Sequence, residues 1–120
     1  VEIRVTSLER TVADVLDRPD LAGGADEVWR SCMSVPALDL TELETYVRVL
    51  GKRNLAAKVG FFLQARAREL AVPPALLGRL RKRAPRSPVY LDRRVRGRRA
   101  PDWNLIVPRS WTVAGEDEQP

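Results

Sequence analysis

The sequence of 120 residues predicts an α+β domain with about five short helices packed with a small sheet of two or three strands formed by the chain ends. Three observations predict this class. Apolar residues recur at helical spacing through the middle of the chain, short apolar or alternating runs stand at both ends, and glycines and prolines separate the segments. The length suits one hydrophobic core, and 44% apolar with 31% charged residues is the composition of a globular domain.

A strand and a helix are predicted at the start of the chain. Residues 1–5 alternate apolar and charged side chains, which is typical of a half-buried strand. Thr6 and Glu9 form the S/T-x-x-E pattern of a capping box, and the apolar spacing that follows predicts a helix from Ser7 to about Asp17. Because the chain begins in a strand and lacks an initiator methionine, we interpret it as a piece of a longer protein.

Two further helices are predicted before the middle of the chain. A short one follows a pair of glycines and carries Cys32 on its apolar side, where we expect a buried structural thiol. The next begins near Leu40 with Asp39 or Thr41 as its cap. It ends at Gly51, a residue type that is common just past helix ends.

A fourth helix is predicted from Asn54 to about Leu70, with a large apolar face and with Arg53, Arg66 and Arg68 available to solvent. Two prolines then break the chain and can begin a fifth helix. The last turn of this fifth helix is rich in cations, which suit the negative end of a helix dipole.

The chain closes with two predicted strands. Pro88–Leu91 and Trp103–Val107 are expected to pair as a hairpin that can join the strand at the N-terminus. We therefore place one domain at residues 1–112, followed by an acidic, disordered tail at residues 113–120. Of the tryptophans, Trp29 and Trp103 fall on predicted core faces, and the sequence leaves Trp111 open.

The residue types exclude most familiar catalytic chemistry. The chain has no histidine and a single cysteine, which rules out an internal disulfide, the usual zinc sets and Ser-His-Asp or Cys-His arrangements. The carboxylates lack acid-base or metal spacing and mostly fall in first turns of helices. We therefore predict a protein that is not an enzyme and that has neither metal nor cofactor.

The sequence also predicts a cytoplasmic protein without a membrane partner. Its longest uncharged run has nine residues and contains two prolines, against the roughly 20 apolar residues that cross a bilayer. The first ten residues lack the apolar segment and the cleavage site of a secretory signal.

Charge is unevenly divided along the chain. Residues 1–50 carry 5 basic and 10 acidic side chains, whereas residues 51–112 carry 16 basic and 3 acidic ones, a net charge of +13. Such a segment favours a surface for a polyanion or an acidic protein, with charge matching inside the molecule or a solvated loop as alternatives. We expect nine cations to form this surface: Lys52, Arg53, Arg79, Arg81, Lys82, Arg83, Arg86, Arg93 and Arg94.

Five segments between about Ile3 and Trp111 resemble the C-terminal domain of AbiEi-type antitoxins, the transcriptional regulators of bacterial type IV toxin-antitoxin and abortive-infection systems. The similarity covers nearly the whole chain, and the order and spacing of the segments carry it. They are VTSLERTVADVL at residues 5–16, RPDLAGG at 18–24, LGKRNLAAKVGFFL at 50–63, SPVYLD at 87–92 and WNLIVP at 103–108.

The resemblance implies a parent protein of two domains. Its N-terminal winged helix-turn-helix, which is absent from this chain, would bind inverted repeats in operator DNA and repress the operon. The C-terminal domain would counteract a nucleotidyltransferase toxin, with no stable complex required. The expected partners are therefore operator DNA, through the full-length protein, and the toxin. A stand-alone basic module that binds nucleic acid, with no toxin partner, is the alternative.

Overall fold

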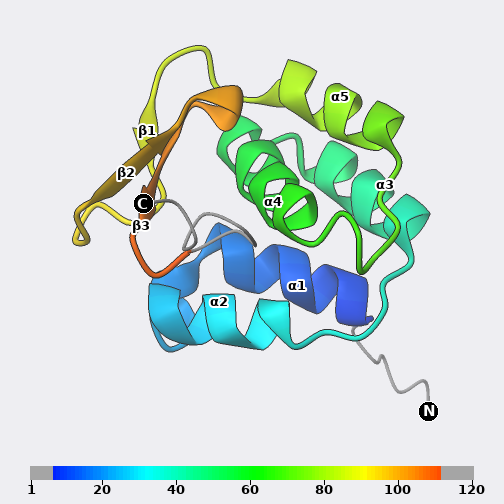
Figure 1. Cartoon of the computed structure of the whole chain (residues 1–120), viewed down its shortest axis with the longest axis horizontal. Helices are drawn as coiled ribbons and strands as arrows, with labels where there is room; N and C mark the ends of the chain where they lie inside the picture. The colour runs from blue at the N-terminus through cyan, green and yellow to red at the C-terminus, as the bar shows by residue number, and fades with distance from the viewer. Residues whose placement is uncertain (1–6, 112–120) are drawn as a thin grey trace.

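Helix α4 lies at the centre of the molecule, with the other helices and a small sheet packed around it (Figure 1). The computed structural model describes residues 7–111. Within these residues it contains five α-helices and three strands, which confirms the α+β class. The helices are α1 (Leu8–Asp17), α2 (Ala25–Met33), α3 (Leu40–Leu50), α4 (Arg53–Ala65) and α5 (Pro74–Arg83). The strands are β1 (Val89–Tyr90), β2 (Gly97–Ala100) and β3 (Leu105–Pro108), with short 3-10 turns η1 (Pro19–Leu21) and η2 (Pro101–Trp103).

The ends of α1 and α3 follow local capping rules, with one correction. Ser7 caps α1, since its Oγ accepts a hydrogen bond from the Arg10 N–H at 3.2 Å. The predicted capping box is therefore wrong: Thr6 lies outside the described residues, and the Glu9 carboxylate accepts instead from the Asp39 N–H at 2.7 Å. Asp39 in turn caps α3, as expected.

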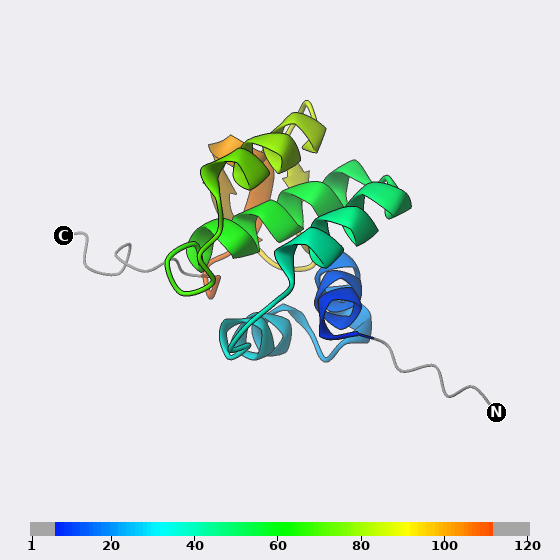
Figure 2. The same cartoon turned by 90° about the vertical axis from the view of Figure 1, so that its right-hand side faces the viewer.

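Helix α3 ends and α4 begins within a few residues. Gly51 ends α3 in the left-handed conformation, with φ 67°, where glycine avoids the strain of a side chain. The chain then reverses, so α3, α4 and α5 lie side by side with alternating directions (Figure 2). Every residue of α4 from Leu55 to Leu63 is buried, because helices pack on several of its sides.

Helix α4 is shorter than predicted and ends at Ala65 rather than near Leu70. The prediction that Arg66 is available to solvent is wrong, since only 7% of this residue is exposed. Its Nη1 donates to the Cys32 carbonyl oxygen at 3.1 Å, so the guanidinium joins α4 to the last turn of α2. Ala71 then adopts a positive φ of 53° in the turn that leads to α5.

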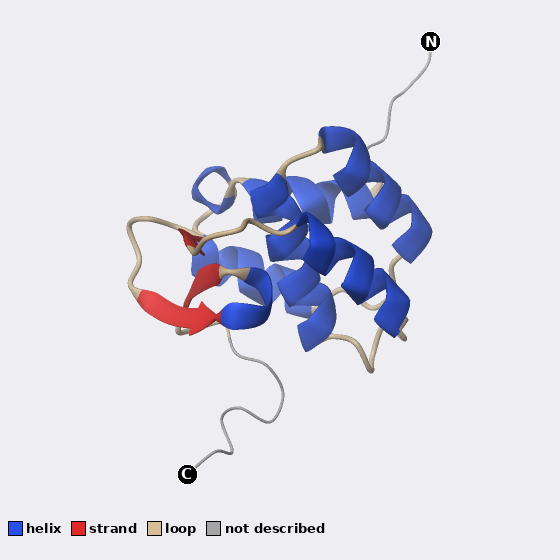
Figure 3. Ribbon diagram, turned by 90° about the horizontal axis from the view of Figure 1, so that it is seen from above, coloured by secondary structure: helices blue, strands red, loops and turns tan. Residues whose placement is uncertain are grey.

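The sheet has the order β1-β3-β2 and lies to one side of the helices (Figure 3). Strand β1 pairs with β3 in parallel, and β2 pairs with β3 in antiparallel fashion. The predicted hairpin of residues 88–91 with 103–107 is therefore wrong, because the connection between them supplies β2. All three strands come from the C-terminal part of the chain, and the strand expected at residues 1–5 lies outside the described residues.

Aromatic rings tie the last described residues to the helices. Trp111, which the sequence left open, is fully buried and stacks on Trp29 with ring centroids 4.6 Å apart. Its indole N–H donates to the Ala25 carbonyl at 3.0 Å. Trp103 and Cys32 are buried as expected. Among residues 7–111, no helix has the length and apolar character needed to cross a membrane.

Candidate anion-binding site

Three helix ends meet at one end of the molecule and form a basic pocket. The carboxyl ends of α3 and α5 lie beside the amino end of α4, toward the right in Figure 2. Between them is a pocket of about 160 Å³, whose apolar wall includes Val47 and Ala56. We define the basic pocket by its four cations: Lys52, Arg53, Lys82 and Arg83.

The two cations at the start of α4, the cap residue Lys52 and the first helical residue Arg53, each have one partner. The Lys52 Nζ lies 2.7 Å from an Asp17 carboxylate oxygen, and the Arg53 Nη1 donates to the Ala84 carbonyl at 3.3 Å. Both residues nevertheless remain exposed, with 55% of the Lys52 side chain accessible. Both groups therefore keep donors for a further oxygen ligand.

The two cations from α5 are exposed, and among the described residues no carboxylate lies within ion-pair distance of either. Lys82 and Arg83 occupy the last turn of α5, where positive charge suits the helix dipole. They therefore supply two charges that no carboxylate among the described residues neutralises, and they do so without destabilising α5.

Cations at the start of α4 conflict with the local helix electrostatics. In α1, α2 and α3 the first turn carries an acidic residue, which suits the positive end of the helix dipole. The first turns of α4 and α5 have no acidic residue, and α4 in addition begins with the cations Lys52 and Arg53. A local rule broken in this way is typical of functional positions, and a bound anion would relieve the conflict.

Two more of the nine predicted cations have partners within the molecule. Arg79 binds Glu44 with two hydrogen bonds, from Nε at 2.6 Å and from Nη2 at 3.0 Å. This bidentate contact, with a smaller contribution from nearby Arg48 and Arg83, holds the pKa of the Glu44 carboxyl below its usual value. The guanidinium of Arg81 lies over the Trp103 ring, 5.2 Å from its centroid.

The three remaining predicted cations lie around the start and end of β1. Arg94 forms an ion pair with Asp92 at 3.2 Å, which lowers the pKa of that carboxyl. Arg93 is exposed and lines a second pocket together with Asn54. Arg86 is exposed in the segment before β1.

The nine predicted residues thus divide into groups. Lys52, Arg53, Lys82 and Arg83 are brought together, and Arg93 reaches the neighbouring pocket. Arg79, Arg81 and Arg94 contact Glu44, Trp103 and Asp92, and neither these three nor Arg86 line the basic pocket.

Arg48 is a cation of this end that sequence reasoning missed. It occupies the last turn of α3, is exposed, and lies near enough to Glu44 to lower the pKa of that carboxyl. Arg48 was not predicted because it belongs to residues 1–50, whose net charge is negative. Its position one turn before Gly51 is the sequence signal that places it close to the start of the next helix.

Two buried titratable groups, Lys58 and Cys32, contribute to the packing of the fold and do not line the basic pocket. The Lys58 amine is buried and donates to the Asp17 carbonyl at 3.1 Å, which fixes the end of α1 against α4. Burial lowers the pKa of this amine. Burial also raises the pKa of the Cys32 thiol to about 12, so the thiol stays protonated and unreactive at neutral pH.

Comparisons of this chain with protein families, with curated proteins and with solved structures found no match. Within residues 7–111, no group of three or more histidine, cysteine, aspartate or glutamate side chains could hold a metal ion. The groups that the site offers to a ligand are therefore the four cations of the basic pocket. Ammonium and guanidinium donors that converge on one small space suit an anion with several oxygens, above all a phosphate group.

Proposed function

We propose that this domain binds the phosphate backbone of nucleic acid through the basic pocket. The observation that carries the proposal is that four cations at the start of α4 and the end of α5 line one pocket, and that within the described residues only Lys52 among them has a carboxylate partner. Like charges gathered in this way repel one another until an anion neutralises them. The role we propose is binding, without catalysis.

Composition and charge favour nucleic acid over a small anion. Residues 51–112 carry a net charge of +13, which produces a positive potential well beyond one pocket. Of the 21 basic residues in the chain 18 are arginine, whose planar guanidinium binds phosphate oxygens in pairs. Because phosphate contacts carry no base information, we expect binding that depends little on sequence.

The resemblance to AbiEi-type antitoxins supports a biological setting for this surface. In that setting the full-length protein would bind operator DNA through its winged helix, and the basic pocket would extend the contact along the backbone. The domain would also counteract a nucleotidyltransferase toxin without a stable complex. This part of the proposal rests on the sequence segments that carry the resemblance.

The binding proposal is tested by fluorescence anisotropy with a labelled oligonucleotide over a range of salt concentrations. Four phosphate contacts on a duplex predict a log-log slope of about −4. The double variant Lys82→Glu/Arg83→Glu should reduce the magnitude of that slope by about 2 and weaken binding at least tenfold. A flat salt dependence of the unmodified protein would overturn the proposal.

The matched control is Arg30→Glu/Arg68→Glu, which changes the net charge by the same amount at exposed positions away from the basic pocket. We expect it to weaken binding about twofold, through the long-range potential alone. Equal losses in the two double variants would show that net charge, and not the pocket, carries the binding.

The antitoxin role is tested separately, by growth of cells that express a nucleotidyltransferase toxin together with the full-length parent protein. Protection from the toxin should be lost with Lys82→Glu/Arg83→Glu and kept with Arg30→Glu/Arg68→Glu. Circular dichroism of both variants checks that they fold. Full protection by the pocket variant would separate the antitoxin role from the basic pocket.

A further inference from the structure

An exposed aromatic ring lies next to the basic pocket. Tyr90, in β1, is 51% exposed, and it is the exposed aromatic residue among residues 7–111. It lines a pocket of about 530 Å³ with Asn54, Pro88, Val89 and Arg93, which we call the Tyr90 slot. The slot thus combines an aromatic face, an amide and a guanidinium.

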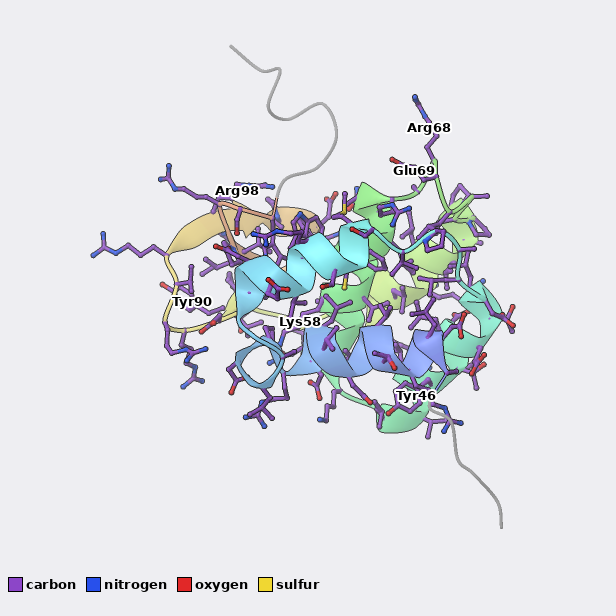
Figure 4. All side chains as sticks on the ribbon, turned by 90° about the horizontal axis from the view of Figure 1, so that it is seen from below. Tyr46, Lys58, Arg68, Glu69, Tyr90 and Arg98 are labelled. Atoms are coloured by element: carbon purple, nitrogen blue, oxygen red, sulfur yellow. The ribbon has the colours of Figure 1, made fainter. Side chains whose placement is uncertain are left out.

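The ring of Tyr90 is free, in contrast to that of the second tyrosine. Tyr46 donates its hydroxyl to Asp14 at 2.9 Å, and Arg10 lies over its ring at 5.3 Å. Within residues 7–111, Tyr90 has neither a side-chain hydrogen bond nor a ring partner. Figure 4 shows the two tyrosines at different ends of the molecule, with Tyr90 at the end that holds the sheet. A free tyrosine face remains available to a ligand.

The slot and the basic pocket share the first turn of α4. Arg53 belongs to the basic pocket, and Asn54, the next residue, belongs to the slot. Consecutive Cα atoms are about 3.8 Å apart, so a single bound chain can contact both sites. Arg93 adds a cation to the lining of the slot itself.

The other aromatic pocket does not offer the same chemistry. It lies between α4 and β2, holds about 170 Å³, and includes Trp103 and Phe61 in its lining. Both rings are almost entirely buried, with 1% and 4% of these residues exposed, so neither presents a face for stacking. The Tyr90 slot is therefore the place where a flat ligand group can stack.

We propose that the Tyr90 slot takes one unpaired nucleobase while the basic pocket holds a phosphate of the same strand. The ligand class is therefore single-stranded nucleic acid, because bases in a duplex are stacked and have no free face. Stacking on the tyrosine tolerates any base, and the Asn54 amide and the Arg93 guanidinium can bond to base edges. This inference rests on the proposed function, since without phosphate binding the slot has no strand to receive.

The test compares a labelled 12-nucleotide single strand, made as DNA and as RNA, with a duplex of the same sequence. The single strand should bind at least fivefold more tightly at equal salt. Tyr90→Ala should weaken binding of the single strand about tenfold and leave duplex binding unchanged. Tyr90→Trp, which keeps an aromatic face, should retain or improve the affinity for the single strand.

Two controls separate the slot from the pocket. Tyr46→Phe removes a tyrosine hydroxyl elsewhere and should leave all affinities unchanged, and thermal melting checks that Tyr90→Ala folds. If Lys82→Glu/Arg83→Glu weakens binding but Tyr90→Ala does not, the slot proposal fails and the phosphate proposal stands. If neither variant weakens binding, both fail.

The competing partner class is an acidic protein, for which poly-glutamate is the probe. Binding of poly-glutamate as tight as that of the single strand, and equally tight in Tyr90→Ala, would overturn the slot. Preference for the duplex over the single strand would overturn it as well. Weak poly-glutamate binding, together with the loss in Tyr90→Ala, is the result we expect.

Discussion

At the amino end of α4 the cations are exposed, whereas at its carboxyl end Arg66 is buried. Lys52 and Arg53 border an open pocket, while Arg66 donates to the Cys32 carbonyl inside the protein. The two ends are separated by a helix about 20 Å long, because each helical residue rises by 1.5 Å. Cations stand at both ends, so the surroundings of each side chain decide whether it is open to a ligand or holds the fold.

The turn after α4 contains two charged side chains that are exposed to solvent. Arg68 and Glu69 both stand out from this turn in Figure 4, and Arg68 extends away from the rest of the molecule. Both are exposed, and neither has a side-chain partner among residues 7–111. They provide charge-matched controls for changes made at the basic pocket.

The largest expected effect comes from a change in the middle of α4, the helix that separates the two ends. Gly60, in the middle of α4, lies against Trp103, and a Cβ atom there would overlap the Trp103 ring. Gly60→Ala should therefore lower the free energy of unfolding by about 3 kcal/mol, as overpacking of a dense core does. Chemical denaturation monitored by tryptophan fluorescence measures the loss.

Gly78→Ala is the matched control for that change. Gly78 lies in α5, and a Cβ there would meet no atom within 4 Å. We expect a gain of about 0.5–1 kcal/mol, because alanine favours the helix over glycine. Stability of Gly60→Ala equal to that of the unmodified protein would show that Trp103 can move aside without cost.

The next test concerns the carboxyl end alone. Arg66→Met keeps the apolar stem but removes the charged hydrogen bond to the Cys32 carbonyl, so we expect a loss of about 2 kcal/mol. Cys32 is the one cysteine of the chain, and its buried thiol, with a pKa of about 12, should react with a thiol reagent only after opening. Its labelling rate should therefore rise in the variant.

Nucleic-acid affinity of Arg66→Met should stay within twofold of the unmodified protein. Arg68→Met supplies the control for stability and labelling, since it removes an exposed arginine two residues away. If Arg66→Met weakened nucleic-acid binding while stability and labelling were unchanged, the division between a ligand-binding end and a structural end would be wrong.

The sequence predicted the features that depend on neighbours in the chain. Asp39, one of the two caps expected for α3, and Gly51, its expected stop, could be predicted because capping uses side chains and backbone within one turn. The arginine-rich connection after β1 gave no pattern of a strand, yet it contains β2. That strand forms because β3 provides a pairing partner, which is a nonlocal effect.

The sequence predicted some of the residues of the basic pocket but not the role of Arg66. Lys82 and Arg83 were expected from charge alone, and they do border the basic pocket. The burial of Arg66 was missed because the carbonyl it binds comes from α2, more than thirty residues away along the chain. Counting charges along the sequence locates a basic segment, but the packing of the helices decides which of its cations line the same pocket.

A smaller change in affinity is expected from Glu44, the carboxylate that binds Arg79 and lies near Arg48 and Arg83. Glu44→Gln should free Arg79 and remove a negative charge near Arg48 and Arg83, so affinity for the single strand should rise about twofold. Glu69→Gln makes the same charge change at the far end of α4 and should have no measurable effect in anisotropy. An equal rise in both variants would mean that position along α4 is irrelevant.

The smallest effect is the pH dependence of stability due to Glu44. In the folded protein the hydrogen bonds from Arg79 lower the pKa of this carboxyl, whereas in the unfolded chain it titrates near 4.3. The unfolded state therefore binds more protons between these two pKa values, and stability rises with pH there. The stabilisation is fully present above about pH 5 and is lost as the pH falls through the lowered pKa.

Other carboxylates titrate in the same window, so the informative quantity is the difference in unfolding free energy between the unmodified protein and Glu44→Gln. Since the variant lacks only this titrating group, the difference isolates the contribution of Glu44. It should be constant from pH 7 to about pH 5 and shrink below that, in denaturation curves measured at each pH. A difference that grew as the pH fell would mean that the pKa of the Glu44 carboxyl is raised in the folded protein, which would contradict a stabilising ion pair between Glu44 and Arg79.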